Sequence, residues 1–247
     1  MKLPIVLERE PLVEAVFEVR MGGSPQMADL LPGALFGQLD PKPTIQRLSA
    51  AEIPLPIRGS DPNLVFAPII RLNWGGFTVS FGDRNMMVSC NLPYPKWPNF
   101  KNAILDIVAK VARVGIAGAV ERYSVKYVNL IQAPTLAEQI SKINLTVRVG
   151  EVEAKDDHLS VQVHHKEDDI LHIISVMTGA RGKLGNSRMV FGAVVDVDSI
   201  RTAVFSDFGA FARNLEPALE GLRQANKVKF FNCLTQEAVY EMGPKYD

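Results

Sequence analysis

Hydrophobic and polar residues alternate along several stretches of this chain, which is the pattern of half-buried β-strands. In residues 11–21 the apolar side chains point to one side, and Glu14 and Glu18 point to the other. The same pattern predicts two or three short strands in 72–93 and one long strand in 118–134. Four further strands are predicted in a row, at 143–152, 158–165, 169–177 and 189–198. Their short polar or glycine-bearing connections favour an antiparallel meander.

Two segments carry apolar residues at helical spacing instead. The first, at about 99–114, has Asn99 in an N-cap position and Gly115 where a left-handed C-cap residue is expected. The second runs over about 207–226, and Pro217 lies on the face opposite its apolar stripe. A proline inside a helix removes one backbone hydrogen bond, so we expect a kink there.

Strands followed by a helix, then strands followed by a second helix, predict an α+β fold with mostly antiparallel sheet and two long helices. The two halves resemble each other loosely. Two divisions therefore stay open. One has an N-terminal half at 1–135 and a C-terminal meander plus helix at 140–247, and the other is one continuous domain. Residues 22–63 contain many prolines and glycines and read as long loops with one helical turn near 28–36.

Composition narrows the function classes. Lys plus Arg and Asp plus Glu both number 27, so a net charge of zero disfavours broad nucleic-acid binding. Cys90 and Cys233 form no CxxC motif, which favours reduced thiols in the cytoplasm. No signal peptide is recognised at the N-terminus, and no stretch approaches the ~20 apolar residues of a membrane span.

All four histidines lie in residues 156–172, among acidic residues. Such a cluster raises the question of a metal site. On the strand at 158–165, however, His158 and His164 lie on one face about 20 Å apart, too far to share an ion.

His164 and His172 could meet across the hairpin only if its loop had an odd length. The tight turn expected at 166–169 favours an even loop, which would place Leu171 opposite His164. We therefore favour no metal site and no cofactor. The alternative is a divalent-metal site formed by His164, His172 and a turn carboxylate such as Asp168.

Charged residues on two of the predicted strands have matching spacing. Glu14 and Glu18 are four residues apart, as are Arg122 and Lys126. If these strands are antiparallel neighbours, Glu14 can pair with Lys126 and Glu18 with Arg122. We predict this pairing, with the face partly covered by the proline-rich segment 38–63. A solvated ladder of salt bridges is one interpretation of the face. The other is a polar cleft, lined by Glu18, Arg20, Arg122 and Lys126.

Two loops are candidate contact sites. Residues 179–188 are rich in glycine and basic: Arg181, Lys183 and Arg188. They lack the order of a P-loop, so a hairpin loop and a phosphate or partner contact both stay open. In the second loop Tyr94 and Trp97 lie among three prolines, which fits either a packed rigid loop or an exposed aromatic recognition surface.

Three stretches together resemble a known family: PLVEAVFEVR near the start, RYSVKYVNLI in the middle and FFNCLTQEAVYEM at the end. VSCNLPYPKWPNF between the first two also fits. The chain is similar over nearly its whole length to a sporadically distributed bacterial and archaeal family of about 250 residues. The resemblance implies no activity. The patchy distribution of the family resembles that of genes on mobile or defence-related islands.

The resemblance also bears on single residues. The middle motif of the family has a charged residue, Tyr, an aliphatic residue and Asn, which correspond here to Lys126, Tyr127, Val128 and Asn129. Asn129 thereby joins the candidate binding residues. The last long helix of the family carries a His where this chain has Asn226, and this departure argues against a role for a helix histidine.

The leading hypothesis is a non-enzymatic cytoplasmic protein that binds a macromolecular partner, because no converging catalytic set is recognised. We expect the partner to be a protein, and the resemblance suggests an accessory of a mobile or defence-related locus. The enzyme alternative is a metal-dependent phosphoester or nucleotide hydrolase that uses the histidine hairpin. A third class is a peptide-holding chaperone, since strands followed by a long helix resemble SecB-like export chaperones. A homodimer is compatible with each of them.

Overall fold

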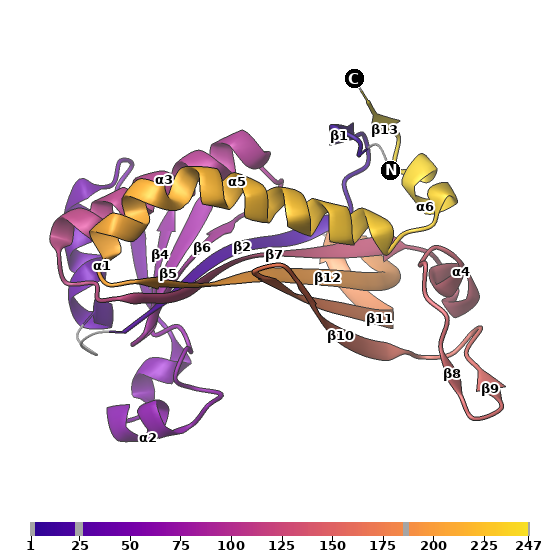
Figure 1. Cartoon of the computed structure of the whole chain (residues 1–247), viewed down its shortest axis with the longest axis horizontal. Helices are drawn as coiled ribbons and strands as arrows, with labels where there is room; N and C mark the ends of the chain where they lie inside the picture. The colour runs from indigo at the N-terminus through magenta and orange to yellow at the C-terminus, as the bar shows by residue number, and fades with distance from the viewer. Residues whose placement is uncertain (1–2, 23–26, 185–187, 247) are drawn as a thin grey trace. The chain divides into compact units, whose positions relative to one another are not determined.

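The computed structural model describes residues 3–22, 27–184 and 188–246, and it confirms an α+β fold with a large antiparallel sheet (Figure 1). The helices are α1 (Met27–Gln38), α2 (Leu55–Ser60), α3 (Trp97–Val114), α4 (Leu136–Ser141), α5 (Phe208–Asn232) and α6 (Gln236–Glu241), with a 3₁₀ turn, η1, at Ser49–Glu52. None of the helices in the described ranges is long and apolar enough to cross a membrane.

Nine strands form one sheet, in the order β10-β11-β12-β7-β2-β6-β5-β4-β3. They are β2 (Leu12–Met21), β3 (Thr44–Arg47), β4 (Ile70–Trp74), β5 (Phe77–Phe81), β6 (Asn85–Cys90), β7 (Val120–Gln132), β10 (Ser160–Glu167), β11 (Ile170–Leu184) and β12 (Arg188–Phe205). Two small sheets pair β1 (Val6–Leu7) with β13 (Pro244–Lys245) and β8 (Arg148–Val149) with β9 (Val152–Glu153).

The chain forms two compact units that alternate along the sequence. Unit 1 comprises Met1–Ala15, Lys126–Ser199 and Leu222–Asp247, and unit 2 comprises Val16–Val125 and Ile200–Gly221. Strands β2, β7 and β12 and helix α5 each contribute residues to both units.

In unit 2, α3 covers its strands with the apolar stripe that the sequence predicted, since Phe100, Ile104, Ile107, Val108 and Val111 are all buried. The helix ends as expected at Gly115, which has the left-handed φ of 75°. It begins at Trp97, earlier than the sequence suggested, so Asn99 is inside the helix and Lys96 is its N-cap. Lys101 forms salt bridges with Glu216 and Glu220 of α5 at 3.2 and 2.8 Å.

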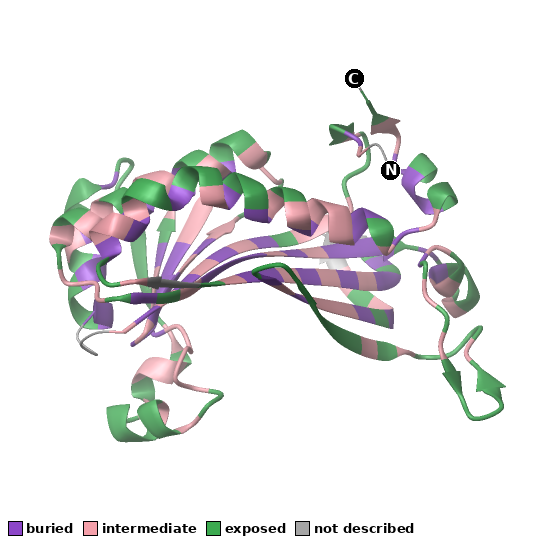
Figure 2. Cartoon of the chain, viewed as in Figure 1, coloured by how far each residue is buried: buried purple, intermediate pink, exposed green. Residues whose placement is uncertain are grey.

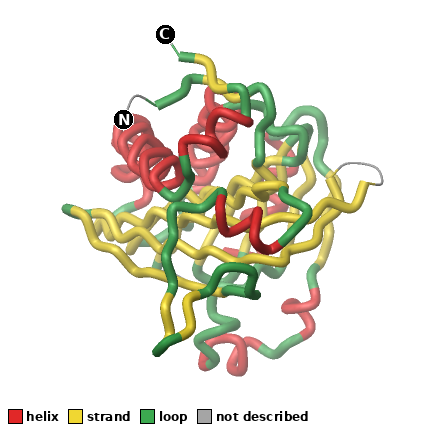
Figure 3. The backbone as a smooth tube through the Cα atoms, turned by 90° about the vertical axis from the view of Figure 1, so that its right-hand side faces the viewer, coloured by secondary structure: helices red, strands yellow, loops and turns green. Residues whose placement is uncertain are grey.

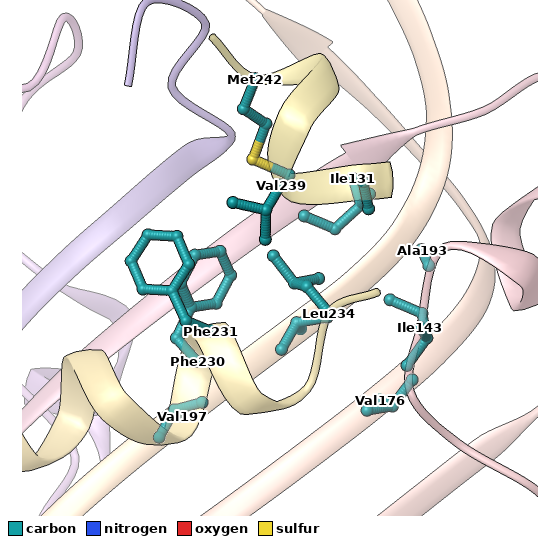
Figure 4. Close-up of a cluster of buried hydrophobic side chains, with 12 residues drawn as sticks. Ile131, Ile143, Val176, Ala193, Val197, Phe230, Phe231, Leu234, Val239 and Met242 are labelled. Carbon is teal, nitrogen blue, oxygen red and sulfur yellow. The ribbon is translucent and has the colours of Figure 1, made fainter. Parts of the chain in front are cut away.

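In unit 1, α5 and α6 lie on one side of the strands (Figures 1 and 3). The buried core between them joins strand and helix residues (Figure 4). It contains Ile131, Ile143, Val176, Ala193, Val195, Val197, Phe230, Phe231, Leu234, Ala238, Val239 and Met242. Helix α6 has Thr235 as its N-cap, whose hydroxyl accepts a hydrogen bond from the Ala238 N–H at 3.3 Å.

The predicted four-strand meander is only partly correct. Strands β10, β11 and β12 correspond to its last three members, but residues 143–152 do not join them. This segment instead holds the β8–β9 hairpin, whose four paired residues are all exposed. With no buried face to fix its register, alternation alone gave a misleading signal there.

Candidate functional site

The histidine hairpin has a different register from the one predicted. Its loop has two residues, Asp168 and Asp169, and Asp168 adopts a positive φ of 51°. This loop places Ile173 opposite His164 and places His172 opposite His165. The prediction that Leu171 faces His164 is therefore wrong, although His164 and His172 are indeed not paired.

His172 lies on the face of β11 that α5 covers, and its side chain is fully buried. Its Nδ1 is 2.8 Å from the Ser199 hydroxyl, which accepts a hydrogen bond from the Asn226 amide at 2.9 Å. Because Asn226 donates, the Ser199 hydrogen is available to Nδ1, and this favours the tautomer protonated on Nε2. Burial and the charge of Lys229 lower the pKa of His172.

The outer end of this cluster reaches the surface through Glu167. Its carboxylate is 4.0 Å from His172 Nε2 and forms a 2.8 Å salt bridge with Lys229 of α5. The hydrogen bond from Lys229 lowers the pKa of Glu167. Ser, His and Glu thus follow one another as in a hydrolytic triad, but Ser199 is 0% exposed and no substrate can reach its hydroxyl. The cluster therefore acts as a structural link between β11, β12 and α5.

The three weak metal candidates do not converge. His172 points toward α5, while His164 lies on the opposite face of the hairpin and contacts Gln162 at 3.0 Å. Asp168 is in the turn. Within the described ranges, no three His, Cys, Asp or Glu side chains are placed to hold a metal ion together.

The prediction that the two charged strands are antiparallel neighbours is confirmed. β2 and β7 are neighbours, and backbone hydrogen bonds from Leu130 to Pro11 and from Gly22 to Ala119 make them antiparallel. In unit 2, Glu18 accepts hydrogen bonds from Arg122 at 3.1 Å, from Arg20 at 3.0 Å and from Asn85 at 2.8 Å.

The cover over Glu18 comes from a residue just beyond the predicted segment 38–63. The Arg20 guanidinium stacks on the Phe66 ring at 3.7 Å, and the Phe66 carbonyl accepts a hydrogen bond from Asn85 at 3.0 Å. Only 12% of the Glu18 side chain stays exposed. Glu18 is thus the centre of a partly buried polar network and not part of a solvated ladder.

The second predicted pair, Glu14 with Lys126, does not form. In unit 1, Lys126 forms its salt bridge with Asp196 of β12 at 3.0 Å, and Glu14 is exposed. Partial burial acts to lower the pKa of Lys126, but the hydrogen bond to Asp196 and the surrounding carboxylates outweigh it, so the pKa is raised. The charge of Glu14 contributes to this shift without direct pairing.

We expect a double-mutant cycle on Glu18→Ala and Arg122→Ala to give a coupling energy of about 1–2 kcal/mol, because both side chains belong to one partly buried network. Urea unfolding of the four proteins measures it. As the matched control, the cycle on Glu14→Ala and Lys126→Ala should give less than about 0.5 kcal/mol, since Lys126 pairs with Asp196. Equal coupling in the two cycles would contradict this interpretation.

The remaining predicted site residues are dispersed. Tyr94 and Trp97 both pack against the buried Phe100, at 6.3 and 6.2 Å between ring centroids, which supports the packed-loop interpretation. Asn129 is buried and donates to the Val195 carbonyl at 3.5 Å. The Arg181 guanidinium stacks on the Phe191 ring at 4.8 Å. The side chains of Lys183 and Arg188 lie outside the described residues.

Unit 1 has a small pocket that sequence reasoning missed. Its volume is about 180 Å³, and segments distant in sequence line it: Arg9, Glu10, Pro11, Leu130, Ile131, Gln132, Lys142, Ala238, Glu241 and Met242. Lys142 and Glu241 form a 2.7 Å salt bridge, and Arg9 donates to the Glu241 carbonyl. The polar groups of the pocket thus bind one another, which fits a structural junction.

A larger feature is the second face of the unit 1 strands, opposite α5. On β11 the residues on this face are Leu171, Ile173, Ser175 and Met177, because their alternate neighbours point toward the α5 core. Three of these four are apolar, and Met177 is 44% exposed. Val194 and the Lys126–Asp196 pair continue the face on β12 and β7. We call this face of the unit 1 strands the bare face; it consists of Lys126, Leu171, Ile173, Ser175, Met177, Val194 and Asp196.

The bare face borders an open sheet edge. β10 is the last strand in the sheet order, and none of the described strands pairs with its outer side. Seven of its eight residues are exposed (Figure 2). Native proteins usually protect such an edge with proline, a bulge, a short strand or charged side chains. β10 contains no proline or glycine, and its charged residues, Lys166 and Glu167, lie at its hairpin end.

Comparison with models of known protein families finds no matching family. Comparison with curated protein sequences finds no significant match.

Proposed function

We propose that this protein is a non-enzymatic binding protein and that the bare face of unit 1 holds a protein partner. The observation that carries the proposal is the row of Leu171, Ile173 and Met177, which is apolar and yet only partly covered, with Met177 44% exposed. The solvated face of an antiparallel sheet normally carries polar residues at these positions. A partly exposed apolar row is more typical of an interaction surface.

The chemistry of the face indicates the partner class. Its salt bridge between Lys126 and Asp196 balances charge, so it offers no basic surface for phosphates. Apolar rows beside a neutralised polar pair favour the side chains of another polypeptide. The two free cysteines, Cys90 and Cys233, support a cytosolic setting as part of the proposal.

The structure bears differently on the two alternatives from the sequence, the hydrolase and the chaperone. For the hydrolase, the histidines diverge and Ser199 is inaccessible, so the geometry gives that alternative no support. A SecB-like chaperone would use the same bare face for unfolded clients. It differs from the leading proposal in expecting many partners instead of one.

Site-specific photo-crosslinking in the native host tests the proposal. A benzophenone side chain in place of Met177 should yield one or a few discrete crosslinked proteins. The matched control places it at Val149 of β8, which is 74% exposed in the same unit, and should yield none. The absence of crosslinks at Met177, or the same set at both positions, would contradict the proposal. Many unrelated partners at Met177 alone would favour the chaperone.

A further inference from the structure

The outer edge of β10 has a defined set of free backbone groups. The Leu159 carbonyl accepts a hydrogen bond from the Thr178 N–H at 3.0 Å, so the backbone groups of Leu159 face β11. Alternation along the strand then directs the backbone groups of Val161, Val163, His165 and Glu167 to β11 as well. The backbone groups of Ser160, Gln162, His164 and Lys166 point away, to the open edge.

We propose that this edge pairs with the β10 strand of a second copy, antiparallel, about a twofold axis at Val163. In this register Ser160 lies opposite Lys166 of the partner subunit, and Gln162 lies opposite His164 of the partner subunit. The outward groups then form about eight hydrogen bonds between the chains. The sheets of two copies become continuous, and the bare face extends across the junction.

Side chains favour this register over its neighbours. Val163 is 50% exposed, and the twofold axis brings it against Val163 of the partner subunit, which covers both apolar side chains. Lys166 faces a serine and not another cation, so no like charges oppose each other. A shift of the axis to His164 would place two imidazoles opposite each other and would use fewer of the outward groups.

The length of the strand supports a second copy as the occupant. All eight residues of β10 pair with β11 without interruption, so its outer edge is a regular strand of the same length. The polar side chains Ser160, Gln162, His164 and Lys166 complement their own reversed sequence. The dimer does not depend on what binds the bare face.

Cysteine crosslinking tests the register. Val163→Cys places two thiols across the axis with Cα atoms about 4.5 Å apart, within disulfide range. Val161→Cys is the matched control, since its two copies lie about 13 Å apart along the strands. Burial raises the pKa of Cys90 to about 12 and of Cys233 to about 11, which slows the oxidation of the native thiols at pH 8. Mild oxidation should link most Val163→Cys chains and few Val161→Cys chains.

Light scattering tests the backbone pairing. The wild type should have the mass of two 27.2 kDa chains. Gln162→Pro removes one outward N–H and should be monomeric, whereas Gln162→Ala loses the same side chain, keeps the N–H and should stay dimeric. A monomeric wild type, a dimeric Gln162→Pro or equal crosslinking at positions 161 and 163 would each overturn the proposal. The cysteine pair decides the matter if Gln162→Pro does not fold.

Discussion

Replacing Arg58 with alanine should lower the free energy of unfolding by about 3–5 kcal/mol, because it leaves a buried carboxylate without its partner. In unit 2 the Arg58 guanidinium binds both oxygens of Asp83, at 3.0 and 3.1 Å, and also donates to the Ile53 carbonyl. The two side chains are only 11% and 9% exposed. Urea unfolding followed by circular dichroism measures the loss.

The chain offers a matched control for this prediction. Arg47 and Glu52 form a 3.6 Å salt bridge in the same region, but their side chains are 70% and 78% exposed. Arg47→Ala should therefore change the stability by less than about 1 kcal/mol. The double replacement Arg58→Met with Asp83→Leu should be less destabilising than Arg58→Ala alone, since it removes the unpaired charge. If Arg58→Ala and Arg47→Ala had equal effects, the burial of the Arg58 pair would contribute nothing.

His172→Ala should lower the free energy of unfolding by about 2–4 kcal/mol, because it leaves a cavity and removes the acceptor of the Ser199 hydroxyl hydrogen. It should also remove a pH dependence. The pKa of His172 is lowered from 6.5 by burial and by Lys229. The unfolded chain therefore binds a proton below pH 6.5 more readily than the folded chain does. Stability of the wild type falls as pH drops from about 6.5 toward the folded pKa, by proton linkage.

The measurement compares unfolding free energies between pH 7.5 and pH 5.5 in three proteins. His172→Ala should show a flatter pH dependence than the wild type. His164→Ala is the control, because this exposed histidine lies on the other face of the same hairpin, and it should change stability by less than about 0.5 kcal/mol. An unchanged pH slope in His172→Ala would show that another group titrates.

Periodicity predicted those elements that a buried face fixes. The apolar stripe of α3 and the alternation in β2 were both readable, because burial selects one side of each element. Residues 143–152 also alternate, yet they lie outside the main sheet. Arg58 and Asp83 escaped notice because one lies in the short helix α2 and the other in the turn between β5 and β6, and no spacing relates residues 25 positions apart.

The candidate site was only partly predictable for the same physical reason. Glu14 and Glu18 have the same four-residue spacing as Arg122 and Lys126. With the strands as antiparallel neighbours, this spacing sufficed to predict the contact between Glu18 and Arg122. Lys126 has a competing partner in Asp196, from a strand whose place beside β7 no local pattern reveals. The bare face could not be predicted because it depends on the order of the strands in the sheet. The residues Leu171 and Met177 do not indicate which side of the sheet a helix will cover.

The affinity of the partner crosslinked through Met177 measures whether the bare face is the binding surface. Titration calorimetry with Met177→Glu and Val149→Glu compares a charge on the bare face with a charge on an exposed hairpin of the same unit. Met177→Glu should raise the dissociation constant at least about tenfold, and Val149→Glu should change it by less than about twofold. Unchanged affinity in Met177→Glu, or equal losses in both variants, would show that the partner does not bind through the bare face.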